Sequence, residues 1–298
     1  MYPSFADVEL EYEKDVQLKR EDVKYLKDWI NKQNHLPKPT EMKLIHFLHS
    51  NGFNIELAKK SIENYYFSRS HCPEFFSKRN PKDEHLKTHL HTNLITILPV
   101  RTKENYPILL TKLIDIAPEK YDLNEALKII DMVVSLIQMQ IGTTPGQVMI
   151  MDAKDFSLGH LLRCNIVSLK KYLFFVQEAS PITLKTVHIV NVSTVTERFS
   201  SLARPFIKKN VYDAIVFHKT VDGLDGIIPK EALPLEMGGT AGTCKELQNE
   251  MIKNLQDHFQ YFLDEEKEIA DESKRIGAVK NASETFGVEG SFKKLEFD

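Results

Sequence analysis

The fold is decided by the stretch that begins Leu184-Lys185-Thr186-Val187-His188-Ile189-Val190-Asn191 and closes at Gly242. The first residues are largely apolar or β-branched at both odd and even positions, which is typical of a strand covered on both faces in an α/β sheet. Ser193 then supplies a helix N-cap. Large apolar residues follow at alternating spacings of four and three, at Val195, Phe199, Leu202 and Phe206. This pattern predicts an amphipathic helix over 195–206 with one apolar stripe turned inward.

Strands and helices alternate along the chain before this stretch. Runs typical of strands occupy 94–100 and 106–114, and a helix that is apolar on two sides is expected over 122–141. A buried strand at 148–151 and helical segments across 157–178 then lead to the strand at 184. The alternation predicts an α/β layer architecture.

In the first part of the chain, the sequence pattern predicts only helices. Apolar positions in 15–33 indicate an amphipathic helix that ends before Pro37. Thr40 and Asn54 are expected to cap the two helices that follow. Helices this short form a small bundle, which we expect to pack against the rest of the protein.

Composition limits the classes of function. The 298 residues are 42% hydrophobic and 27% charged, as in an ordinary globular protein. With a formal net charge of -3, the chain as a whole gives no argument for nucleic-acid binding. Three widely spaced cysteines favour a reducing compartment over a disulfide framework. We expect neither a signal peptide nor a membrane-spanning segment, and at most peripheral membrane contact.

Catalytic and metal-binding motifs are weak. His71-Cys72 approaches the phosphatase loop, but Lys78 stands where that motif requires Arg, and Gly239 to Lys245 is a broken P-loop. His85 and His89 are spaced to share a zinc ion, yet no Cys or carboxylate has a matching offset. The expectation is therefore no catalytic residue, no metal and no cofactor.

Several motifs, taken in order, carry a family resemblance. They are His188-Ile189-Val190-Asn191, then Arg204-Pro205-Phe206, then Leu233-Pro234-Leu235-Glu236-Met237-Gly238-Gly239. They resemble the CRAL-TRIO lipid-binding family, and in particular its tocopherol-transfer and arthropod members. Two further segments resemble the same family, the helical front end from Phe47 to Phe76 and the closing Gly290 to Glu296.

The resemblance implies a fold and a function. It implies an N-terminal helical module over 1–80, followed by a CRAL-TRIO lipid-binding α/β domain over 81–262. That domain would have a mixed, mostly parallel sheet and a helical lid over an apolar pocket, and a charged tail with a short strand would follow over 263–298. It also implies a cytoplasmic carrier, not an enzyme, that holds one hydrophobic molecule under the helix 195–206. Candidate ligands are a tocopherol, a retinoid, a carotenoid or a similar isoprenoid.

The resemblance also assigns residues to the site. The pocket wall would consist of Met149, Met151, Leu158, Cys164, Tyr172, Phe175, Val176, Leu184, Val187, Val195, Phe199 and Leu202. The membrane headgroup contacts, including phosphoinositide binding, would come from Lys185, Arg204, Lys208 and Lys209. Two positions that are basic in tocopherol-transfer relatives are Asn210 and Ala214 here, which weakens the case for phosphoinositide-triggered release.

Two other functions remain open from the sequence. One is an adaptor or membrane-recruitment module, in which bulky side chains such as Tyr172 and Phe175 fill the pocket. The other is an enzyme that acts on a hydrophobic substrate. A cavity between the sheet and residues 195–206 would favour the carrier, and a filled interior would favour the adaptor.

Overall fold

The α/β architecture is confirmed. The computed structural model describes residues 4–277 and 280–287. Its sheet has five strands in the order β1-β2-β3-β4-β5. The bounds are β1 Asn93–Ile97, β2 Ile108–Leu113, β3 Gln147–Asp152, β4 Leu184–Val190 and β5 Ile215–Phe217. β1 pairs antiparallel with β2 and the other neighbouring pairs are parallel, so the sheet is mixed and mostly parallel.

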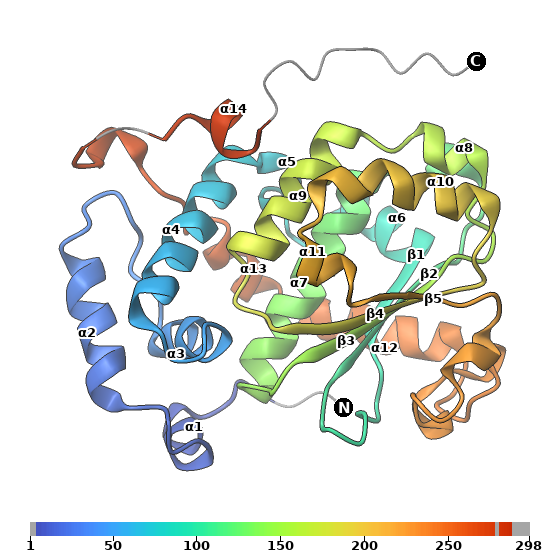
Figure 1. The fold of residues 1–298 in the computed structure, drawn as a ribbon, viewed down its shortest axis with the longest axis horizontal. Helices are drawn as coiled ribbons and strands as arrows, with labels where there is room; N and C mark the ends of the chain where they lie inside the picture. The colour runs from blue at the N-terminus through green and yellow to red at the C-terminus, as the bar shows by residue number, and fades with distance from the viewer. Residues whose placement is uncertain (1–3, 278–279, 288–298) are drawn as a thin grey trace.

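One face of the sheet is covered by the helices that connect its parallel strands (Figure 1). These helices are α7 (Leu123–Ile141), α8 (Leu158–Leu162), α9 (Ile166–Glu178), α10 (Thr194–Ala203) and α11 (Lys209–Tyr212). From β2 to β5 the chain moves from each strand to the next in the same direction across the sheet. Because such parallel crossovers are right-handed, the connecting helices all lie on one face. The apolar residues of α7 pack there against Ile95 and Leu109.

The opposite face is covered by the segment that follows β5. It contains the 3-10 turns η3 (Val221–Leu224), η4 (Lys230–Ala232) and η5 (Leu235–Met237), and it leads into α12 (Cys244–Asp257). Leu233 and Met237 pack there against Val148 and Ile150 of β3. Gly238 makes the turn possible, because it ends η5 with a φ of 78°, in the left-handed region.

The N-terminal part is helical, as the sequence predicts. It comprises α1 (Val8–Lys14), α2 (Arg20–Asn31), α3 (Glu41–Ser50), α4 (Ile55–His71), α5 (Pro73–Phe76) and α6 (Glu84–Thr92). Thr40 caps α3 by accepting from the Lys43 amide at 3.3 Å, and Asn54 caps α4 by accepting from the Leu57 amide at 3.0 Å. The expected caps are therefore confirmed.

This helical part shares its core with the α/β domain. Phe47 and Phe67 belong to one hydrophobic cluster with Leu169 of α9 and Leu123 of α7. The remaining elements are η1 (Pro118–Lys120), η2 (Arg204–Phe206), α13 (Phe259–Glu265), η6 (Glu272–Lys274) and α14 (Ala282–Thr285). The strand expected at Ser291 to Phe297 lies outside the described residues.

Candidate functional site

The sheet face beneath α9 and α10 presents two rows of apolar residues. Strand register aligns Met149 with Val187 and Ile215, so these three side chains share one face. Two residues further along each strand, Met151 aligns with Ile189 and Phe217 on the same face. The second row lies at the carboxyl ends of the parallel strands, which is where α/β sheets commonly bind ligands.

The helix α10 begins directly after β4 and lies beside α9 (Figure 1). Ser193 caps it, with its Oγ accepting from the Thr196 amide at 3.3 Å. The predicted stripe is partly enclosed, because Val195, Phe199 and Leu202 are all half-buried. The Phe199 ring lies 5.8 Å from the Phe156 ring. The final turn of the predicted helix is the separate 3-10 turn η2, in which Pro205 follows Arg204.

Six half-buried apolar residues form what we call the lid site. They are Met151, Ile189 and Ile215 on the sheet, with Val195, Phe199 and Leu202 on α10. Phe199 packs against the cluster shared with the N-terminal helices, whereas the other five belong to none of the three hydrophobic clusters of the described residues. The lid site is therefore apolar surface that the protein's own core leaves partly uncovered.

Several other predicted wall residues lie elsewhere. The Tyr172 ring packs against Phe75 at 5.4 Å, and the Phe175 ring packs against Phe76 at 4.8 Å. These two buried rings therefore face the N-terminal helices. Leu158 is 46% exposed on α8.

The remaining predicted wall residues do not belong to the lid site. Cys164 and Val176 are half-buried against the cluster of the N-terminal helices, and Met149 packs against the cluster under α7. Val187 is buried and Leu184 is half-buried. The lid site also contains Ile189 and Ile215, which are not among the predicted wall residues. Ile189 could have been found, because alternation along the strand places it on the same face as Val187.

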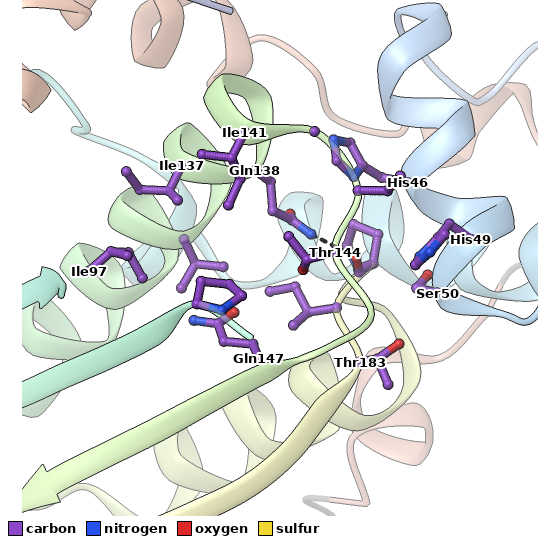
Figure 2. Close-up of a pocket in the computed structure, with 16 residues that line it drawn as sticks. His46, His49, Ser50, Ile97, Ile137, Gln138, Ile141, Thr144, Gln147 and Thr183 are labelled. Atoms are coloured by element: carbon purple, nitrogen blue, oxygen red, sulfur yellow. Dashed lines mark hydrogen bonds between the residues drawn. The ribbon is translucent and has the colours of Figure 1, made fainter. Parts of the chain in front are cut away.

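Two small cavities lie away from the lid site, at the contact between the N-terminal helices and the α/β domain. Figure 2 shows the first cavity between α3, which carries His46 and His49, and α7, which carries Ile137 and Gln138. Each cavity has a volume of about 20 Å³. That volume holds about one water molecule. Neither cavity is lined by any of the predicted wall residues.

Two of the predicted membrane contacts are already paired within the protein. Lys208 forms an ion pair with Glu178, and Lys209 pairs with Asp213 at 2.6 Å. Both lysines remain exposed. The Lys209–Asp213 pair is exposed on both sides, and ion pairs of this kind contribute little to stability.

The other two predicted contacts lie over aromatic rings. The exposed Lys185 has its Nζ 5.7 Å from the centre of the Tyr106 ring, near the amino ends of the parallel strands. The exposed Arg204 stacks over Tyr212 at 4.4 Å. Each of the four basic residues therefore already has a carboxylate or an aromatic ring as a neighbour within the protein.

The weak catalytic and metal-binding motifs of the sequence can be compared with their surroundings in the described residues. Among the described residues, no group of three or more His, Cys, Asp or Glu side chains could hold a metal ion. His85 forms a pair with Glu125 at 3.3 Å instead. Burial raises the pKa of the Cys72 thiol to about 12, so it is not the thiolate that a phosphatase needs.

Within the described part of the chain, no helix combines the length and the apolar content needed to cross a bilayer.

Comparison with known proteins gives two family matches. Residues 91–239, half of the chain, match the CRAL/TRIO domain, and residues 15–86 match the Pinta-like UBA domain. The alpha-tocopherol transfer protein-like proteins of Mus musculus and Homo sapiens are each 28% identical over 225 residues. The matched region covers 74% of this chain and 65% of each relative.

A solved structure supports the same fold. The crystal structure of Sfh5 aligns with a TM-score of 0.52 at 14% identity, over 83% of this chain and 97% of that one. At this identity the similarity shows the fold alone.

Proposed function

Because the chain belongs to the CRAL/TRIO family of lipid-binding and lipid-transfer domains, we propose that it carries one small hydrophobic molecule at the lid site. The name of the relatives, alpha-tocopherol transfer protein-like, favours a tocopherol as the ligand. A retinoid, a carotenoid or a similar isoprenoid is kept in the proposal beside it. In this proposal the protein binds and transfers its ligand without converting it.

The observation that carries this proposal is the partly uncovered apolar surface of the lid site. Met151, Ile189 and Val195 are half-buried, yet pack into none of the hydrophobic clusters of the described residues. Covering apolar surface stabilises a complex by about 25 cal/mol per Å². A ligand between α10 and the sheet would therefore gain free energy from residues that the folded chain leaves incompletely packed.

Ligand entry requires α10 to move. A drug-sized ligand occupies a pocket of roughly 300–1,000 Å³. The described cavities are far smaller and lie elsewhere. We propose that α10 swings away from α8 and α9 to admit the ligand, as lids do in other binding proteins.

The experiment that tests the carrier function is identification of a bound lipid. Protein purified from its native tissue is extracted with organic solvent, and the extract is analysed by mass spectrometry. The expected result is one lipid at a stoichiometric amount. Ligand-free protein that also fails to take up labelled tocopherol, retinol or carotenoid would contradict the proposal.

A membrane-recruitment adaptor is the second candidate, and the position of the cavities favours it. The adaptor hypothesis expects side chains to fill the space between the sheet and α10. Neither of the two cavities lies in that space. The adaptor predicts vesicle binding without uptake of any lipid into the protein interior. A tracer lipid that stays with the protein through gel filtration would therefore exclude it.

Location and domain organisation are part of the same proposal. We propose a cytoplasmic protein, since Cys72, Cys164 and Cys244 are all free thiols. We also keep the divisions at 1–80, 81–262 and 263–298 as proposals. The matched ranges 15–86 and 91–239 support the first division to within a few residues.

A further inference from the structure

His160 carries a buried hydrogen-bond donor with no partner. The residue lies in the short helix α8 and is fully buried. The Ser157 amide donates to His160 Nδ1 at 3.1 Å. Since a backbone N–H can only donate, Nδ1 must accept, and the proton of the neutral ring must be on Nε2. His160 Nε2 has no hydrogen-bond partner among the described residues.

Burial also keeps the His160 ring neutral. Removal from water disfavours the charged imidazolium and lowers the pKa of His160. The ring is therefore a neutral donor at physiological pH, and it does not attract anions. A buried N–H without a partner is uncommon in folded proteins and needs an explanation.

Aromatic rings connect His160 to the lid site. The His160 ring stacks on Phe156 with 5.6 Å between ring centres and 27° between planes. Phe156 in turn contacts Phe199 of α10 at 5.8 Å. Tyr121 lies edge-on to the His160 ring at 5.5 Å. His160 is thus one ring away from the helix that must move when a ligand enters.

We infer that His160 Nε2–H recognises an oxygen atom of the bound lipid, and that the protein selects oxygenated isoprenoids over the corresponding hydrocarbons. The inference rests on the proposed carrier function and adds the chemical class of its ligand. Movement of α10 separates Phe199 from Phe156 and opens the path to His160. A hydroxyl, carbonyl or ether oxygen can then accept the hydrogen bond that the closed protein lacks.

The first test compares two ligands that differ in one oxygen. Retinol and anhydroretinol share one carbon skeleton, but only retinol has a hydroxyl group. Fluorescence titration of the unmodified full-length protein is expected to give a Kd about tenfold lower for retinol, the gain from one buried hydrogen bond. Canthaxanthin and β-carotene, which differ in two keto groups, form a second pair for a protein that accepts only longer ligands.

The second test follows the nitrogen itself. In ¹⁵N-labelled protein, the Nε2 signal of His160 is expected to shift when retinol binds and to shift little with anhydroretinol. A merely structural histidine would not distinguish the two ligands. A signal unchanged by retinol would mean that the donor faces the Tyr121 ring instead, and this would overturn the inference.

Substitution provides the third test. His160→Phe keeps an aromatic ring but has no hydrogen-bond donor. This variant should therefore bind retinol and anhydroretinol with about equal affinity. The matched control is His46→Phe, because His46 is also buried with an unpartnered Nε2 but lies at α3, beside the two small cavities. It should retain the full preference.

The two proposals fail in different ways. Equal affinity for both members of each pair in the unmodified protein overturns the role of His160 and leaves the carrier function standing. Binding of no member of either pair counts against the carrier function, and the role of His160 fails with it. If His160→Phe does not fold, the ligand pairs and the nitrogen signal still decide the question.

Discussion

At the scale of single residues, Phe199 is the side chain that most directly joins the fold to the proposed function. It is half-buried, and it contacts Phe156 rather than lying deep in the core. Its substitution should therefore affect ligand binding more than folding. This property separates it from Tyr172 and Phe175, whose rings are needed by the core.

We predict that Phe199→Asp weakens ligand retention at least tenfold, since it places a charge on the inner side of α10. The cost to the free energy of unfolding should be about 1 kcal/mol. Retention of a tracer lipid and chemical denaturation measure the two effects. Ser201→Asp adds the same charge on the exposed side of α10 and should leave retention unchanged. Equal retention by Phe199→Asp would show that the lid site does not hold the ligand.

His46 gives the protein a pH-dependent stability. Burial lowers the pKa of His46 from 6.5 to about 4. The folded protein thus binds this proton less readily than the unfolded chain does. The stabilisation is present above about pH 6.5 and is lost as the pH falls from there toward about 4.

For this residue we predict that His46→Phe flattens the dependence of the unfolding free energy on pH between 6.5 and 4, by about 3 kcal/mol across the window. Urea denaturation at several pH values measures the slope. Burial also lowers the pKa values of His188 and His218, so some slope should remain in the variant. Parallel curves for the two proteins would show that His46 titrates normally in the fold.

At the scale of elements, α8 presents apolar side chains to solvent beside the lid. Leu158 is 46% exposed and Leu162 is 62% exposed. The helix packs against α10 and against η1. An exposed apolar surface next to the helix that we propose to move is suited to the surface of a membrane, where a ligand could pass directly into lipid.

We predict that Leu158→Asn combined with Leu162→Asn lowers vesicle binding about tenfold while leaving stability almost unchanged. Co-sedimentation with vesicles of phosphatidylcholine and phosphatidylserine measures the loss. Leu57→Asn serves as the control, because Leu57 is 50% exposed on α4 among the N-terminal helices. A similar loss in the control would mean that general surface hydrophobicity, rather than α8, drives the binding.

At the scale of the whole molecule, a buried charge network joins the N-terminal helices to the α/β domain. Glu265 of α13 accepts from Arg79 at 3.0 Å and from Tyr261 at 3.1 Å, and it pairs with Lys43 of α3 at 3.4 Å. Burial alone would raise the pKa of the Glu265 carboxyl. Arg69, Lys43 and Arg79 outweigh that effect and hold the pKa well below its usual range.

We predict that Glu265→Gln lowers the free energy of unfolding by about 3–5 kcal/mol, since it leaves buried arginines without their carboxylate. Thermal or urea unfolding measures the change. Asp264→Asn on the exposed side of α13 is the matched control and should leave the free energy of unfolding almost unchanged. A small effect at Glu265 would mean that Asp131, which accepts from Arg79 at 2.6 Å, compensates the arginines alone.

The sequence by itself determined the elements and their class. Local signals were sufficient for this, because a cap such as Thr40 or Ser193 acts on amides within a few residues of it. The two-sided apolar pattern of α7 likewise predicted a helix enclosed on both sides, and its residues do belong to buried clusters. The order of motifs from His188 to Gly239 was enough to indicate the family.

Only the tertiary structure decided which apolar residues are core and which are left partly uncovered. Tyr172 and Val195 look equally suitable for a pocket wall in the sequence, but one packs on the N-terminal helices and the other does not. The buried hydrogen-bond donor of His160 could likewise not be predicted from the sequence. The physical reason is that burial and hydrogen-bond partners depend on contacts between segments distant along the chain, whereas capping and periodicity depend on neighbours within a turn.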